Sequence, residues 1–178
     1  MTEIRKILVN GSHPLFKKEG MLYKEFPSDY KQIRYFTVLI VQKASPEIRD
    51  VNLLEQQISE LIKNAIKHGN KLDPRKFVRV WFYFSLEEAR LIVQDEGEGF
   101  QKIEEWNAFN AQRIRCFNER DFERMAQYVS YRTQSSDDTD GGNALFAALE
   151  YWNGGVVFDE KRTSVAVKRI FSSKKFSS

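Results

Sequence analysis

The hydrophobic residues of this chain recur with two different periods, and the two periods predict a mixture of helices and strands. Over residues 30–43 and 45–69, apolar side chains return every three or four positions, which is the spacing of one helical face. Pro46 suits a first helical turn, and Gly69 is a typical residue at a helix end. Alternating or continuous apolar runs predict strands at 4–9, 22–26, 77–84, 89–93, 156–159 and 164–171.

The pattern becomes irregular between residues 100 and 140. Helical stretches are expected at 104–110 and 121–129, a polar loop at 135–140, and a further helix at 143–151. This order of elements predicts the α+β class, as a two-layer sandwich with helices on one face of a mostly antiparallel sheet. We expect one domain over 22–171, an N-terminal appendage over 1–21 and a polar tail over 172–178.

Composition narrows the class of protein. The chain has 178 residues, of which 42% are hydrophobic and 30% charged, as in an ordinary globular domain. Its 28 Lys and Arg against 25 Asp and Glu leave no basic excess of the kind that nucleic-acid binding requires. A single cysteine, Cys116, excludes an intramolecular disulfide and a cysteine-rich zinc site. Without a long apolar run or a signal-peptide core near the start, we expect a cytoplasmic protein with no membrane contact.

The second long helix carries a candidate polar line. Glu60, Asn64 and His68 follow one another at intervals of four, which places them on one stripe of the helix. An amide oxygen suits Mg²⁺, and a nearby carboxylate can act as a base or hold a water molecule. The alternative is an ordinary solvated helix face, with His68 bonding the last carbonyls of the helix.

Two glycine-containing segments could contact a ligand. Asp95 ends a strand and is followed by Gly97 and Gly99, so the backbone there can turn sharply or approach a ligand closely. A carboxylate in this position can accept a hydrogen bond from an exocyclic amine such as that of adenine. Gly141 and Gly142 precede a helix, whose first N–H groups form an anion site. The alternatives are a plain turn and a flexible loop.

The order of these motifs resembles that of the histidine-kinase-like ATPase superfamily. The motifs are Glu-x-x-x-Asn on a helix (60–64), Asp-x-Gly-x-Gly after a strand (95–99) and Gly-Gly before a helix (141–142). The run 60–70 is similar to the small bacterial anti-sigma-factor serine kinases of the partner-switching type. The resemblance covers about residues 22–171 and implies a histidine-kinase-like ATPase fold with an extended ATP lid over 100–140.

The resemblance also implies ligands and roles for residues. ATP or ADP would bind with Mg²⁺; Asn64 would hold the Mg²⁺, and Asp95 would accept from the adenine amine. Glu60 would be the general base that takes the proton from an attacking serine or threonine hydroxyl, with Arg132 as a lid cation. The other nucleotide-binding residues implied are Gly97, Gly99, Gly141, Gly142, Asn143 and Thr163.

The function implied is that of an ATP-binding anti-sigma factor and serine/threonine-protein kinase. Such a protein binds a sigma factor, phosphorylates a STAS-domain anti-anti-sigma partner, forms a homodimer and regulates transcription. One alternative is a nucleotide-gated binding module with little or no catalysis, which Ala144 and the acidic residues 137–140 favour. Another is a nucleic-acid accessory, based on the Lys and Arg pairs at 168–169 and 174–175. We favour the kinase, because nucleotide binding alone does not require a base at position 60.

Overall fold

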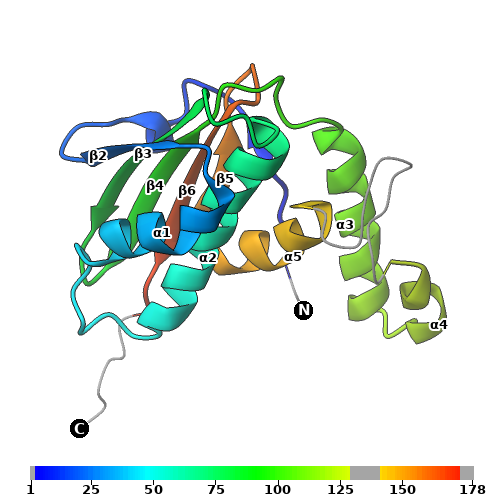
Figure 1. The fold of residues 1–178 in the computed structure, drawn as a ribbon. Helices are drawn as coiled ribbons and strands as arrows, with labels where there is room; N and C mark the ends of the chain where they lie inside the picture. The colour runs from blue at the N-terminus through cyan, green and yellow to red at the C-terminus, as the bar shows by residue number, and fades with distance from the viewer. Residues whose placement is uncertain (1–2, 129–140, 173–178) are drawn as a thin grey trace, which may run out of the picture.

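A six-stranded mixed sheet organises the chain (Figure 1). The structure is a computed structural model that describes residues 3–128 and 141–172. Across the sheet the strands follow the order β1 (Leu8–Val9), β5 (Gly155–Phe158), β6 (Ser164–Ile170), β4 (Glu88–Gln94), β3 (Phe77–Phe84) and β2 (Leu22–Pro27). β1 runs parallel to β5, and the other neighbouring pairs are antiparallel.

Three helices cover one face of this sheet, which confirms the α+β class. They are α1 (Ile33–Val41), α2 (Val51–Asn64) and α5 (Gly141–Tyr151) (Figure 1). α3 (Ile103–Asn118) and α4 (Phe122–Met125) stand beside α5, away from the sheet (Figure 1). Short helical turns complete the described part: η1 (Pro14–Phe16), η2 (Tyr30–Gln32), η3 (Ala65–Gly69) and η4 (Ala126–Tyr128). Among the described helices, none has the length and apolar character needed to cross a membrane.

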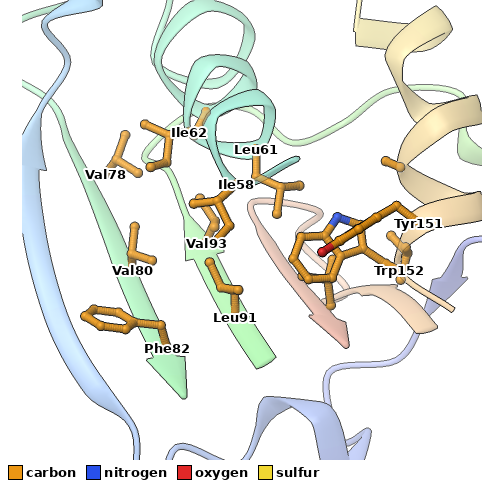
Figure 2. Close-up of a cluster of buried hydrophobic side chains, with 14 of the residues drawn as sticks. Ile58, Leu61, Ile62, Val78, Val80, Phe82, Leu91, Val93, Tyr151 and Trp152 are labelled. Carbon is orange, nitrogen blue, oxygen red and sulfur yellow. The ribbon is translucent and has the colours of Figure 1, made fainter. Parts of the chain in front are cut away.

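The main core lies between α2 and the central strands. Alternate residues of β3 and β4 point toward the helices, as the period of two predicts, and are almost fully buried. Figure 2 shows these side chains facing the apolar stripe of α2, with the aromatic pair at the end of α5 beside them. The labelled members are Ile58, Leu61, Ile62, Val78, Val80, Phe82, Leu91, Val93, Tyr151 and Trp152.

The N-terminal segment, expected as an appendage, contributes to the same sheet. It supplies β1 at one edge and lays η1 across the second face, where Leu15 packs with Ile92 and Val157. The side chain of Asn107 in α3 pairs with the backbone of Ile7, donating to its carbonyl at 2.9 Å and accepting from its N–H at 2.8 Å. This pairing ties α3 to the strand edge.

Two helix starts differ from the expected ones. α2 begins at Val51 rather than after Pro46, because Asp50 takes a left-handed conformation with φ of 58° and interrupts the helical path. The first long helix is split into a 3-10 turn, in which Asp29 accepts from the Lys31 N–H, and the α-helix that starts at Ile33. The expected stretch 121–129 contains one turn of α-helix followed by a 3-10 turn.

The packing of α2 gives a direct test of this core. Ile58 is 0% exposed, whereas Leu53 on the outer side of the same helix is 41% exposed. We expect Ile58→Ala to lower the free energy of unfolding by about 2–5 kcal/mol, since it removes methyl groups and leaves a cavity. Leu53→Ala, measured by the same urea denaturation, should cost less than about 1 kcal/mol. Equal losses for the two variants would contradict this placement of α2.

Candidate functional site

The candidate site begins at the end of α2, where the helix widens into a π turn. η3 covers Ala65–Gly69, and the Asn70 N–H closes it by donating to the Ala65 carbonyl at 2.8 Å. In a π turn the backbone hydrogen bonds join residues five apart, rather than four, and such turns occur frequently at functional sites. The helix end that follows Glu60 and Asn64 is therefore irregular: His68 lies within this turn, and Gly69 and Asn70 close it.

The turn after β4 lies directly against this helix end. The Asp95 N–H donates to the Thr163 carbonyl at 2.9 Å, which joins the strand end to the start of β6. The Gly97 N–H donates to Asp95 Oδ1 at 2.9 Å. On the other side, the Phe100 N–H donates to the Arg162 carbonyl at 2.9 Å. The structure thus places Asp95 next to Thr163, with Gly97 and Gly99 in the turn that follows Asp95.

Glycines allow the end of α2 and the turn after β4 to lie close together, because a side chain at these positions would clash with a neighbouring part of the chain. A Cβ added at Gly69 would clash with the Asp95 carboxylate, and one added at Gly97 would clash with the Gly69 carbonyl oxygen. Gly99 has φ of +96°, and a Cβ there would clash with the Lys161 carbonyl oxygen. In the structure Gly97 and Gly99 give room to the end of α2 and to the β5–β6 turn, and their approach to a nucleotide stays a prediction.

The Asp95 carboxyl group is the most perturbed acid of the site. Burial raises its pKa to about 6, against a smaller lowering by the Gly97 N–H; the charge of Asp159 adds to the rise, and Lys76 opposes it. Among the described residues, Gly97 supplies the hydrogen bond to this carboxylate. A carboxylate has about four acceptor positions, so Asp95 keeps capacity for a donor from a ligand.

Asn70 is the residue that the sequence analysis missed. It is 0% exposed, and its side-chain amide donates to Ser28 Oγ at 2.8 Å and to the Phe77 carbonyl at 3.0 Å. Its Oδ1 accepts from the Glu96 N–H at 2.7 Å. In the sequence, Asn70 follows a helix-ending glycine and is indistinguishable from a loop residue, so no local signal indicated its burial.

Glu60 and Asn64 lie half-buried on α2. Neither side chain forms a hydrogen bond or an ion pair with the residues that the structure describes. Among these residues, no group of three His, Cys, Asp or Glu side chains could hold a metal ion by itself. One amide and one carboxylate are nevertheless a suitable donor set for Mg²⁺ when phosphate oxygens and water supply the other ligands.

The expected phosphate-binding segment opens α5. The helix begins at Gly141, so Gly141, Gly142 and Asn143 form its first turn. In the second turn, the Phe146 ring lies 5.1 Å from that of Trp106 in α3. The structure places this end of α5 on the α3 side, whereas Asp95 lies against the end of α2. Arg132 and the acidic residues 137–140 lie outside the described residues.

Comparison with known proteins found a partial match. The chain is 33% identical over 99 residues to a protein named inorganic pyrophosphatase from Nanoarchaeum equitans (strain Kin4-M). The aligned region covers 53% of this chain and 60% of the relative, so the chain spans less than two thirds of that protein's length. No family model matches the chain.

This match overturns the resemblance to the histidine-kinase-like ATPases and their anti-sigma-factor branch. An alignment of 99 residues tests far more positions than three short motifs, and it leads to a protein named for hydrolysing pyrophosphate. The predictions of a serine/threonine kinase, an anti-sigma factor and transcription regulation are therefore wrong. The sigma-factor and STAS-domain partners, and the homodimer inferred with them, are withdrawn, as is the binding-module alternative of the same fold. The expected magnesium is compatible with a relative that hydrolyses pyrophosphate, whereas the name of that relative gives no support to ATP or ADP.

The raised pKa of Asp95 predicts a stability that falls as pH rises. An acid with pKa of about 6 in the folded state and 3.8 when unfolded keeps its proton longer in the folded state. Its contribution is fully present below pH 3.8 and is lost as pH rises through 6. We expect Asp95→Asn, which keeps the shape and removes the charge, to exceed wild type in unfolding free energy by about 2–3 kcal/mol at pH 8. Near pH 4 the difference should be small.

Urea denaturation at several pH values measures this difference. Asp73→Asn is the control, because hydrogen bonds from Arg75 lower the pKa of Asp73 to about 2. Loss of that charge should bring no gain at high pH. A constant difference between Asp95→Asn and wild type across the pH range would show that Asp95 is not desolvated.

Proposed function

We propose that this chain binds the magnesium complex of a phosphoanhydride, at the 95–99 turn and along α2, and hydrolyses it. The single observation that carries the binding proposal is the half-buried Asp95 carboxylate with acceptor capacity left over. The relative named inorganic pyrophosphatase supports a P–O–P bond as the bond that is cleaved. Because the match covers only part of each chain, hydrolysis by this chain is a proposal.

Asp95 favours a nucleoside phosphate as the ligand. Holding a carboxylate out of water costs free energy, and a ligand that donates a hydrogen bond to it recovers part of that cost. The exocyclic amine of adenine is such a donor. A bare phosphate would instead meet an anion that is mostly ionised at neutral pH. The proposal therefore places the base of ATP or ADP at Asp95, with Gly97, Gly99 and Thr163 forming the surrounding backbone.

The phosphate end of the ligand is assigned to α2 and α5. Asn64 would hold Mg²⁺ through its amide oxygen. When bound, Mg²⁺ supplies charge neutralisation for the phosphate oxygens. The first-turn N–H groups of α5, at Gly141, Gly142 and Asn143, would bind a phosphate, because these groups have no partner within the helix.

Glu60 is the proposed base for hydrolysis. It lies one turn before Asn64 on the same side of α2, and thus next to the proposed metal ligand. Glu60 would take a proton from a water molecule as the water oxygen attacks the terminal phosphorus. The bond from that phosphorus to the bridging oxygen breaks, and the bridging oxygen leaves with the second phosphate. The products are inorganic phosphate and the shortened ligand.

A second candidate ligand is inorganic pyrophosphate itself. The name of the relative favours it. Pyrophosphate has no hydrogen-bond donor comparable to an adenine amine, so it would use the Glu60 and Asn64 end of the site and leave Asp95 without a contact. The two candidates therefore differ in their dependence on Asp95.

Equilibrium binding and phosphate release with ATP, ADP and pyrophosphate, each with and without Mg²⁺, test this proposal. For a nucleotide ligand, Asp95→Asn should weaken binding at least tenfold, as expected on losing a hydrogen bond to a charged group. Asn64→Ala should remove most of the Mg²⁺ dependence. Glu60→Gln should lower phosphate release by about a hundredfold or more, with affinity within a few-fold.

Three outcomes would change the proposed ligand, the proposed base or the proposed function as a whole. Binding of pyrophosphate that is insensitive to Asp95→Asn would select the second candidate. Wild-type phosphate release from Glu60→Gln would remove Glu60 as the base. If the folded protein binds none of the three compounds with Mg²⁺, the proposed function is wrong.

A further inference from the structure

We infer that Asn70 is a positioning residue for this site: it fixes the turn after β4 relative to the end of α2 and thereby sets ligand affinity. The effect on affinity rests on the proposed function, but the positioning itself can be measured without any ligand. Asn70 contacts no reacting atom in this proposal; it acts through Asp95 and Glu96.

Asn70 belongs to a closed ring of hydrogen bonds. Asn70 Oδ1 accepts from the Glu96 N–H, and Asn70 Nδ2 donates to the Phe77 carbonyl. The Phe77 N–H in turn donates to the Glu96 carboxylate. Three segments, the helix end, the start of β3 and the turn after β4, are thus joined through three residues. Asn70 is the fully buried member of this ring.

A second contact fixes the orientation of the amide. Asn70 Nδ2 also donates to Ser28 Oγ, whose own hydroxyl donates to the Lys76 carbonyl at 2.8 Å. The two amide hydrogens of Asn70 are therefore both used, and its oxygen is turned toward Glu96. A flipped amide would direct an N–H at the Glu96 N–H and leave two acceptors without a donor.

The backbone of the same residue terminates the helix. The Asn70 N–H closes the π turn that directly follows Glu60 and Asn64 on α2. One residue consequently links the helix side of the site to the Asp95 side. Loss of the side chain would leave the Glu96 N–H without a protein partner and would loosen the turn that holds Asp95 against Gly69.

The experiment compares Asn70→Ala with Asn110→Ala. Asn110 is a matched control, because it is a buried amide in α3, 4% exposed, whose Nδ2 donates to the Arg5 carbonyl and which takes no part in the hydrogen bonds around Asn70. Affinities for Mg-ADP and Mg-pyrophosphate are measured where both variants are folded. We expect Asn70→Ala to weaken binding of the nucleotide about tenfold or more, and Asn110→Ala to stay within about twofold. Equal weakening by both variants would overturn the inference.

A double-mutant cycle distinguishes a specific effect through Asp95 from a general loss of stability. If Asn70 acts through Asp95, the combined variant Asn70→Ala with Asp95→Asn should bind little more weakly than Asp95→Asn alone. Independent effects would multiply. Multiplication of the two fold-changes would assign Asn70 a role separate from Asp95 and would overturn the inference.

Nuclear magnetic resonance tests the positioning without a ligand. In wild type, the Glu96 amide should exchange with solvent about a hundredfold more slowly than an open turn, and Asn70→Ala should bring the pKa of Asp95 back toward 3.8. Fast exchange of this amide in wild type would overturn the inference even if Asn70→Ala does not fold. If the protein binds none of the compounds, the proposed function fails, and the amide exchange together with the Asp95 titration still decides the role of Asn70.

Discussion

The close contact between the end of α2 and the turn after β4 is the constraint on which the candidate site depends. Gly69 and Gly97 can meet only because neither carries a side chain, and the Asp95 carboxylate lies in the same narrow space. This approach removes Asp95 from water and raises its pKa. It also buries Asn70, which then has to satisfy its amide within the protein.

The site is consequently a region where stability and ligand recognition oppose each other. The apolar faces of α2, β3 and β4 form the hydrophobic core, whereas the ends of the same elements hold a desolvated acid and a buried amide. The side-chain amide of Asn70 has hydrogen-bond partners for both its N–H groups and its oxygen. The carboxylate of Asp95 has one hydrogen-bond donor among the described residues, so keeping it ionised and half-buried at neutral pH lowers the stability of the fold. Acids with shifted pKa values are frequent at functional sites, and so are π turns such as the one beside Asp95.

The sequence was a reliable guide to elements whose signal is periodic. The strand 77–84 agrees with β3 at both ends, and the strand 89–93 lies within β4, because alternation with a buried face is a local property of the chain. The start of α2 was placed wrongly, since the left-handed conformation of Asp50 leaves no mark in an amphipathic pattern. The burial of Asn70 depends on tertiary contacts, with Phe77 in β3 and with Glu96 in the turn after β4, which no local periodicity records.

The family inference failed for a related physical reason. A pattern such as Asp-x-Gly-x-Gly reports that the backbone must approach something closely, but it does not identify that neighbour. In this structure, Gly97 and Gly99 approach other parts of the chain itself. The Asp-x-Gly-x-Gly motif therefore correctly indicated a place where chain segments meet, since Asp95 lies next to Thr163. The order of the motifs along the chain, however, led to the wrong family.

The geometry of α2 also limits which phosphoanhydride can use the whole site. Glu60 lies nine residues before Gly69, which corresponds to about 13 Å along a helix axis. A ligand that reaches both Asp95 and Glu60 must therefore be elongated, with a hydrogen-bond donor at one end and anionic groups at the other. A nucleoside phosphate has this shape and this distribution of charge. Pyrophosphate can occupy the Glu60 and Asn64 end alone, and in that case the free energy spent on desolvating Asp95 would serve no ligand contact.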